Sequence, residues 1–245
     1  MSSENVKPYA AAGGKKEQMR SMFDRIAPSY DRLNHLLSFG IDRLWRRRAT
    51  RRVAAAAPVA ILDLATGTGD WALLLAQRLP AAEIVGLDLS TEMLEAARRK
   101  AARCRLTAPR LTFAEGDAEQ LPLADGSVDA VTVGFGVRNF ARLEQCLAEM
   151  HRVLRPDGTV AVLELSIPKN RLWRAIYGLY SDRLLPFVGG VLSGDRKAYR
   201  YLPASVRAFH TPERFVELMQ AAGFRNCCAR SQSFGIARIY IGEKL

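Results

Sequence analysis

The chain has 245 residues, of which 49% are hydrophobic and 8% aromatic, and its formal net charge is +11. These values are typical of one globular domain with a full core, and they exclude a disordered chain. No run of 18 apolar residues is present, which excludes a bilayer-spanning helix. The basic excess fits a nucleic-acid ligand, an anionic membrane surface or solvated helix faces.

The N-terminus and the cysteines indicate a cytoplasmic protein. Residues 1–16, a predicted flexible leader, lack the apolar run of a signal peptide. Cys104, Cys146, Cys227 and Cys228 have no metal-ligand spacing, so we predict structural thiols in a reducing compartment and no bound metal.

Residues 17–57 are predicted to be helical, with a break near Ser38–Gly40. Arginine is concentrated after this break, at Arg43, Arg46, Arg47, Arg48, Arg51 and Arg52.

Residues 58–169 alternate between short apolar runs and helical segments. Ser90 is a predicted helix cap, and RPDG (155–158) is a predicted tight turn. The predicted strands are 59–65, 83–89, 110–116, 128–135 and 159–166, and the predicted helices are 70–79, 91–103 and 141–154. This alternation predicts an α/β fold with a parallel, doubly wound sheet.

The last quarter of the chain departs from this rhythm. Residues 170–208 are predicted to be a helical insertion, and 209–245 to be a helix capped by Thr211 followed by two strands. A turn at 233–235 predicts that these strands form an antiparallel hairpin at the sheet edge. We therefore expect a single domain over residues 17–245.

The glycine turn after the first strand predicts a nucleotide-like cofactor. In GTGDWA, the spacing of Gly67, Gly69 and Ala72 matches the dinucleotide fingerprint, and Asp88 follows about 20 residues later. Both a nicotinamide dinucleotide and S-adenosylmethionine carry an adenosine that this arrangement can hold.

Three features favour S-adenosylmethionine. Asp63 and Asp70 place negative charge in the turn, which complements a cationic sulfonium and would repel a pyrophosphate. In GDAEQLP, Asp117 can accept from the adenine amino group and Ala118 can supply a backbone amide. The helix end, turn and late strand of 154–165 match class I methyltransferases. A short-chain dehydrogenase would carry a Tyr-x-x-x-Lys pair on a helix. The one match in this chain, Tyr240 to Lys244, lies on the predicted terminal strand and so does not support that class.

Longer segments make the resemblance specific. They are SMFDRIAPSYDRLNHLLSFGIDRLWRR (21–47), LDLATGTGD (62–70), GDAEQLP (116–122), VGFGVRNF (133–140), LELSIP (163–168) and SGDRKAYRYLPASV (193–206). From about residue 17 to the C-terminus, the chain resembles the demethylmenaquinone and ubiquinone C-methyltransferases. The resemblance implies a class I, Rossmann-like methyltransferase fold and S-adenosylmethionine-dependent methylation of 2-demethylmenaquinol to menaquinol, the last step of menaquinone biosynthesis. A prenylated benzoquinol of ubiquinone biosynthesis is the alternative.

Site residues follow from the resemblance and from the chemistry. Carbon is a poor nucleophile unless a neighbouring hydroxyl is partly deprotonated, so the substrate must be the quinol. Arg138, after the fourth strand, is the first candidate to favour the phenolate, although a salt bridge closing a loop is the alternative. Asn139 would orient the ring. The resemblance assigns Tyr30, Asp31 and His35 to an N-terminal lid over the cofactor core, 58–169. The predicted cofactor-binding residues are Asp63, Gly67, Thr68, Gly69, Asp88, Asp117, Ala118 and Gly134.

The insertion at 171–194 is apolar at helical spacing, which predicts core packing, a tunnel for the prenyl tail, or both. In the tunnel interpretation, the flanking arginines contact anionic headgroups, and the enzyme is peripheral at the inner face of the membrane. A homodimer is compatible with the sequence. A nucleic-acid methyltransferase is disfavoured because no binding module is appended, and a non-catalytic scaffold because the cofactor turn is intact.

Overall fold

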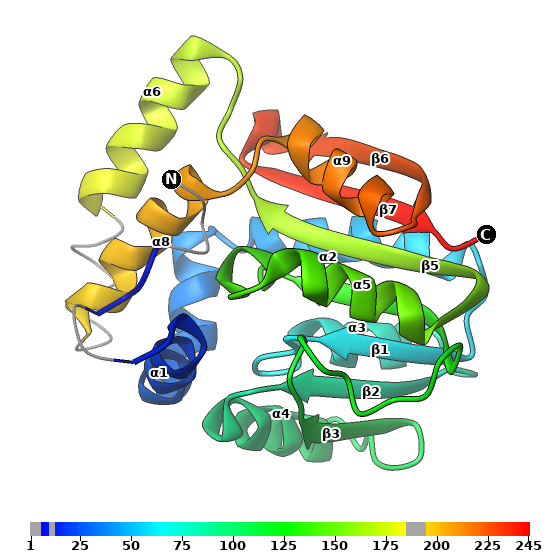
Figure 1. Cartoon of the computed structure of the whole chain (residues 1–245). Coiled ribbons are helices and arrows are strands. Elements are labelled where there is room, and N and C mark those ends of the chain that lie inside the picture. The colour runs from blue at the N-terminus through cyan, green and yellow to red at the C-terminus, as the bar shows by residue number, and fades with distance from the viewer. Residues whose placement is uncertain (1–5, 10–12, 185–194) are drawn as a thin grey trace.

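The computed structural model describes residues 6–9, 13–184 and 195–245 (Figure 1). At its centre is a seven-stranded sheet in the order β3-β2-β1-β4-β5-β7-β6. The strands are β1 (Ala60–Leu64), β2 (Glu83–Asp88), β3 (Leu111–Glu115), β4 (Val128–Gly134), β5 (Leu154–Leu165), β6 (Arg225–Gln232) and β7 (Ala237–Glu243). β1 to β5 pair in parallel, whereas β7 is antiparallel to both β5 and β6. The predicted doubly wound sheet with an antiparallel terminal hairpin is confirmed.

Helices cover both faces of this sheet. The helices are α1 (Lys15–Leu37), α2 (Ile41–Ala54), α3 (Asp70–Arg78), α4 (Thr91–Arg103), α5 (Leu143–Val153), α6 (Arg171–Leu179), α8 (Arg196–Ala208) and α9 (Pro212–Ala221). α2 and α3 pack on one face through a core that contains Trp45 and Trp71. α5 and α9 pack on the other face, around Leu147 and Phe215 (Figure 1).

Local sequence signals set most helix boundaries. The Ser90 side chain accepts the N–H of Met93, and that of Thr211 accepts the N–H of Arg214, as expected for N-caps. Between α1 and α2, Gly40 adopts φ 70°, which is the left-handed conformation that ends helices and that glycine tolerates best. The predicted break in the N-terminal helical segment is confirmed.

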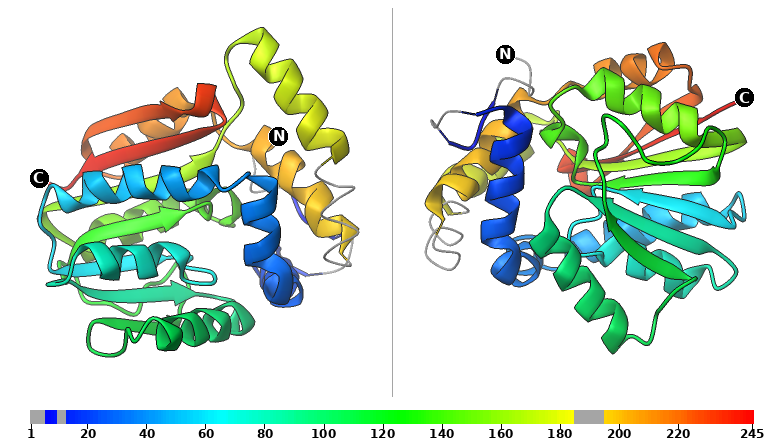
Figure 2. Two further views of the ribbon diagram at one scale, coloured as in Figure 1. Left: turned by 180° about the vertical axis from the view of Figure 1, so that it is seen from behind. Right: turned by 60° about the horizontal axis from the view of Figure 1, so that its bottom comes forward.

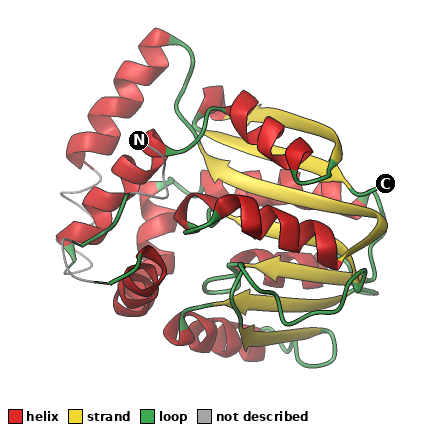
Figure 3. Cartoon of the chain, in the orientation of Figure 1, coloured by secondary structure: helices red, strands yellow, loops and turns green. Residues whose placement is uncertain are grey.

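Three helices gather beyond the carboxyl ends of the parallel strands. Figures 2 and 3 show α1, α6 and α8 on this side of the sheet, apart from the helices that cover its faces. Met19 and Met22 of α1 share a small buried core with Met93 of α4 and Tyr199 of α8. Ligands bind at this end of open α/β sheets, so α1 and α8 are placed beside the expected site.

The structure differs from the sequence prediction at two places. β5 begins at Leu154, and the predicted RPDG turn is an irregularity inside this strand, because the pairing moves from Leu154–Val128 to Thr159–Ala130. The predicted insertion contains α6, a π-helical turn at Tyr180–Leu184, and α8. Residues 185–194, which also belong to it, lie outside the described residues.

Within the described ranges, no helix combines the length and the apolar character needed to cross a membrane.

Candidate active site

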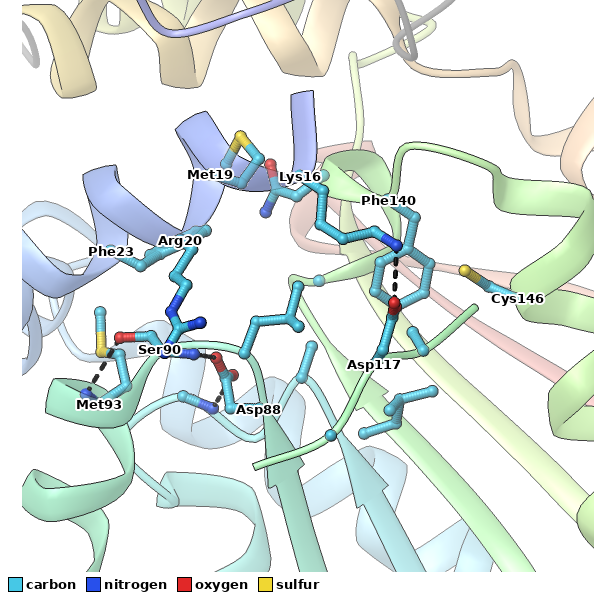
Figure 4. A pocket seen from close by; sticks show the side chains of 18 of the residues that line it. Lys16, Met19, Arg20, Phe23, Asp88, Ser90, Met93, Asp117, Phe140 and Cys146 are labelled. Atoms are coloured by element: carbon cyan, nitrogen blue, oxygen red, sulfur yellow. Dashed lines mark hydrogen bonds and ion pairs between the residues drawn. The ribbon is translucent and has the colours of Figure 1, made fainter. Parts of the chain in front are cut away.

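A cavity of about 780 Å³ lies at the carboxyl ends of β1, β2 and β4, beneath α1 (Figure 4). Its floor includes Gly67 of the glycine turn, Asp88 at the end of β2, and Gly134 at the end of β4. Asp117 and Ala118 line it from the loop after β3. Five of the predicted cofactor-binding residues are therefore brought together around one cavity.

The glycine turn exposes backbone to this cavity. Gly67 adopts φ 56°, and a side chain built there would meet open space rather than protein. Its N–H donates to Oδ2 of Asp88 at 2.8 Å. Gly69, at φ 78°, does not line the cavity and instead allows close packing on Ala97 and Phe113. Gly67 therefore leaves space in the cavity, whereas Gly69 allows close packing at the start of α3.

Asp88, at the end of β2, is the acid that lies beside the glycine turn in the cavity. Its carboxylate accepts from the N–H groups of Gly67 and Ser90, at 2.8 and 2.9 Å (Figure 4). Burial raises the pKa of Asp88, although these backbone hydrogen bonds oppose the rise. The carboxylate is therefore fixed in place by the same loop that shapes the cavity.

Asp63 and Thr68 were predicted to bind the cofactor, but they are not among the residues that line the cavity. Asp63 is buried, and its two oxygens accept from the hydroxyls of Thr66 and Thr132 at 2.6 Å each. Burial raises its pKa to about 6. The Thr68 hydroxyl donates to Asp31. Both side chains hold the turn in shape because their polar atoms are used within the protein.

Lys16 closes the opposite end of the cavity and was not predicted from the sequence. Its Nζ lies 2.6 Å from Oδ2 of Asp117 and 2.7 Å from Oε2 of Glu119. Figure 4 shows this side chain reaching down from α1 to the loop after β3. The ammonium group therefore joins the helix above the cavity to the acid expected to bind adenine.

Among the predicted lid residues, Tyr30 lines the cavity, whereas Asp31 and His35 do not. Asp31 pairs with Lys100 of α4 at 2.7 Å. His35 lies 3.0 Å from Asp42 of α2 and 3.4 Å from Asp70 of α3. These two predicted residues therefore anchor α1 to its neighbours.

The ligand atoms of His35, Asp42 and Asp70 lie within 4.8 Å of one another, a spacing that a metal ion can also use. Two cations already neutralise the carboxylates: Arg46 pairs with Asp42, and Lys100 pairs with Asp70 at 2.5 Å. Burial opposes the effect, but Arg46 and Lys100 together hold the pKa of Asp70 below its ordinary value. We interpret the cluster as an ion network joining α1, α2, α3 and α4.

A second cavity, of about 690 Å³, adjoins the first. Aromatic and aliphatic side chains dominate its lining, among them Trp45, Leu165 and Tyr177. Tyr30 and Phe135 line both cavities. These two rings therefore lie where a group bound in one cavity meets a group bound in the other.

Arg138 lines this second cavity and is 6% exposed. Its Nη1 donates to Oε1 of Glu164 and to the carbonyl of Phe135, at 2.6 Å each. Burial alone would lower the pKa of Arg138, but the Glu164 carboxylate raises it. Its Nε is buried with no hydrogen-bond partner among the described residues. The salt bridge considered from the sequence is present, and it fixes a cation in the cavity wall.

Asn139 lines the first cavity rather than the second. Its Oδ1 accepts from the hydroxyl of Tyr201 at 3.1 Å, and its Nδ2 donates to the carbonyl of Phe135. The side chain is thus tied to α8 and to the segment that follows β4.

Glu164 and the rings of Trp45 and Tyr177 were also missed. Glu164 is fully buried in the apolar second half of β5 (160–165), and such an acid requires a buried cation as its partner. That signal was present in the sequence. The two rings carried no comparable signal, because a buried core has the same aromatic spacing.

Comparison with known proteins agrees with this geometry. A model of the ubiE/COQ5 methyltransferase family matches residues 12–244. The demethylmenaquinone methyltransferase of Deinococcus radiodurans is 47% identical over 244 residues, covering 100% of both chains. The ubiquinone/menaquinone biosynthesis C-methyltransferase UbiE of Geotalea uraniireducens is 46% identical over 231 residues, covering 94% of this chain and 97% of that one. A solved SAM-dependent methyltransferase from Aquifex aeolicus matches with a TM-score of 0.57 at 17% identity, over 76% of this chain and 82% of that one.

The structural match confirms the predicted class I methyltransferase fold. The family match confirms the enzyme class and the dependence on S-adenosylmethionine that the acids of the turn predicted. With nearly the whole length matched, the chain belongs to the ubiE/COQ5 methyltransferase family.

Proposed function

We propose that this protein methylates a ring carbon of a reduced, prenylated naphthoquinone, 2-demethylmenaquinol, to give menaquinol. The observation that carries the proposal is the pair of adjoining cavities that share Tyr30 and Phe135 as a common wall. One cavity carries the carboxylates of Asp88 and Asp117 that a cofactor needs, and the other has aromatic side chains that suit a flat, apolar ring. The full-length identity to a protein named demethylmenaquinone methyltransferase supports the same substrate.

The first cavity fits S-adenosylmethionine. When bound, this cofactor supplies an electrophilic methyl group. Asp88 offers fixed carboxylate oxygens for a ribose diol, and Asp117 offers an acceptor for the adenine amino group. Gly67 presents bare backbone to the cavity. Asp63 and Thr68 act indirectly by holding the glycine turn.

Arg138 is the group that we assign to the quinol. A carbon of the ring attacks only when the adjacent hydroxyl has lost much of its proton, so a cation near that oxygen favours the reaction. Arg138 lines the second cavity, and its charge is therefore beside any ring bound there. Glu164 orients the guanidinium. Arg138 therefore stabilises the phenolate, and Asn139 positions Phe135 beside the ring.

The aromatic wall excludes water from the transfer. Tyr30 and Phe135 lie between the two cavities, and Trp45 and Tyr177 line the second one. An in-line displacement gains most of its acceleration from positioning, up to about 7–11 kcal/mol in favourable cases. The wall supplies this positioning by fixing the ring plane against the cofactor cavity.

A prenylated benzoquinol of ubiquinone biosynthesis is the second candidate. The name of the relative from Geotalea uraniireducens includes both pathways, at nearly the same identity. A benzoquinol is narrower than a naphthoquinol and would leave part of the second cavity unfilled.

The prenyl tail also sets where the enzyme works. A quinol with such a tail resides in a bilayer, so we propose a cytoplasmic enzyme that acts at the inner face of the membrane as a peripheral protein. The net charge of +11 supports contact with anionic lipids.

The test is methyl transfer from labelled S-adenosylmethionine to short-tailed demethylmenaquinol, with the oxidised quinone and the demethoxy benzoquinol in parallel. We expect label in the naphthoquinol only, and only under reducing conditions. Label in the benzoquinol alone would move the protein to the ubiquinone pathway. No label in either quinol, with the cofactor still bound, would contradict the proposed substrate.

Two variants test the role of Arg138 in the same assay. Arg138→Met should abolish transfer while leaving cofactor binding intact. Arg214→Met is the matched control, since Arg214 pairs with the exposed Glu217 on α9, and the activity of this variant should equal that of the wild type.

A further inference from the structure

Exposed hydrophobic side chains are concentrated at one place on the described surface. Ten large hydrophobic residues are exposed among the described residues, and two of them, Val59 and Leu245, lie elsewhere. Of the other eight, four fall within residues 36–44, three lie on α6, and one is Phe234 in the turn between β6 and β7. Such clustering marks an interaction surface, whereas scattered exposed residues need no explanation.

Several of these residues are chain neighbours of residues that line the second cavity. Phe39 follows Ser38, Leu44 precedes Trp45 and Ile176 precedes Tyr177, and each of these three neighbours lines that cavity. We call residues 36–44, α6 and the turn 233–235 the apolar rim. Its members face solvent while the adjacent residues face the cavity.

Direct contacts join the three segments of the apolar rim. Phe39 packs on Tyr180, which directly follows α6, with ring centroids 6.2 Å apart. Trp173 of α6 stacks on Phe234 at 4.3 Å. Trp45 donates through Nε1 to the hydroxyl of Ser233 at 2.9 Å. The rim is therefore one continuous surface, even though its segments are up to about two hundred residues apart in the chain.

A basic hollow adjoins the apolar rim. It is lined by Arg48, Arg51 and Arg52 of α2 and by Arg230 of β6. Arg48 donates to Gln232 at 2.8 Å, and none of the four arginines forms an ion pair with a described residue. β6 ends at Gln232, directly before the turn that carries Phe234. Guanidinium groups that have no ion-pair partner among the described residues therefore lie next to exposed apolar side chains.

We infer that the apolar rim and the basic hollow together dock the enzyme on an anionic lipid bilayer. The rim inserts its side chains among the acyl chains, and the hollow binds lipid phosphates, because arginine matches phosphate geometry. The opening of the second cavity then faces the membrane, so a prenylated quinol enters without crossing water. This inference rests on the proposed function for the identity of the substrate, but not for the docking itself.

The charges favour a membrane over a second copy of this chain. A copy with a net charge of +11 would bring a second basic hollow towards the first, and like charges repel. Anionic lipids offer both an apolar layer and a negative surface, which match the rim and the hollow side by side.

The test is flotation of the full chain with vesicles of phosphatidylcholine alone and of phosphatidylcholine mixed with phosphatidylglycerol. We expect binding to the anionic vesicles only. The double variants Phe39→Ser/Leu44→Ser and Arg51→Glu/Arg52→Glu should each weaken binding about tenfold or more. Val59→Ser and Arg78→Glu/Arg103→Glu are matched controls, since these side chains are exposed and belong to neither the rim nor the hollow, and both variants should bind as the wild type does.

Methyl transfer separates this inference from the proposed function. None of the substituted residues lines either cavity of the site, so transfer to a short-tailed quinol in solution should be unchanged in every variant. Transfer to a long-tailed quinol in anionic vesicles should fall in the rim variant, Phe39→Ser/Leu44→Ser, and in the hollow variant, Arg51→Glu/Arg52→Glu. A wild-type protein that ignores anionic vesicles, or that buries the rim by self-association in sedimentation, would overturn the docking inference. Either result would leave the short-tail assay as the test of the substrate.

Discussion

Arg138 and Glu164 form a buried ion pair at the wall of the second cavity, with Nη1 and Oε1 separated by 2.6 Å. The Arg138 backbone N–H also donates to Glu164, as does that of Leu165. The carboxylate therefore fixes both the guanidinium and the 3-10 turn at Val137–Asn139 that carries it.

Glu164→Gln should lower both the stability and the activity of the enzyme. A neutral amide keeps the shape of the side chain but leaves the Arg138 charge buried without compensation, which costs about 3 kcal/mol of unfolding free energy. Urea unfolding measures this loss, and the labelled-methyl assay should show a fall in kcat larger than the change in KM. Unchanged unfolding would contradict the buried pair. Glu217→Gln, in an exposed pair with Arg214, should shift stability by no more than about 0.5 kcal/mol.

Asp88→Asn should weaken cofactor binding by roughly 10- to 100-fold. The substitution keeps the size of the side chain but removes the charge, and charge-assisted hydrogen bonds contribute about 1.5–3 kcal/mol each. Calorimetric titration with S-adenosylhomocysteine gives the affinity. Asp125→Asn is the control, because Asp125 is exposed in the loop before β4 and pairs with Arg152. Equal affinities for the wild type and Asp88→Asn would remove Asp88 from the cofactor site.

Lys100→Met should loosen α1 without unfolding the domain. Lys100 joins Asp31 of α1 to Thr68 and Asp70 beside the glycine turn, and without it two half-buried carboxylates face each other. We expect faster amide hydrogen exchange in α1 and weaker cofactor binding. Arg99→Met, one residue earlier, removes an exposed pair with Glu95 and should leave both measurements unchanged. Identical exchange in the two variants would exclude the anchoring role.

Asp63 should make folding stability depend on pH. Its pKa in the folded protein is about 6, above the ordinary value of 3.8, so the folded state holds the proton more tightly than the unfolded chain. The stability that this group contributes is therefore full below pH about 4 and is lost as pH rises through about 6. Asp63→Asn removes the titration.

Urea unfolding across this pH range gives the difference in unfolding free energy between the wild type and Asp63→Asn. Between acidic and neutral pH, this difference should change by about 1–3 kcal/mol in favour of the variant. Thr132→Val removes a hydrogen bond that opposes the rise in pKa, and it should move the transition to higher pH. A difference that is constant with pH would contradict a raised pKa at Asp63.

The sheet and most helices could be predicted from the sequence because their signals are local. An apolar run makes β1, and single caps such as Ser90 and Thr211 start helices within a few residues of themselves. The irregularity in β5 was predicted as a turn. The hydrogen bonds that hold Asp157 and Gly158 in the strand come from Lys244, at the other end of the chain.

The site was predicted less completely because its geometry depends on distant contacts. The spacing around Gly67 identified the cofactor turn, but it could not show that Asp63 points inward to Thr66 and Thr132. Lys16 meets Asp117 across 101 positions of the chain, and no local pattern predicts such a pair. Which polar residues of a motif reach the cavity is decided by packing rather than by spacing.

Met19, Arg20 and Phe23 of α1 line the first cavity, whereas residues next to the apolar rim, such as Ser38 and Tyr177, line the second. We expect the two ligands to enter and leave by different routes. The spent cofactor should depart only when Lys16 releases Asp117 and α1 lifts, while the quinol exchanges with α1 in place. By-product release would then limit turnover at saturating quinol, and rising ionic strength, by weakening the Lys16 pair, would speed the cycle before it harms the chemistry.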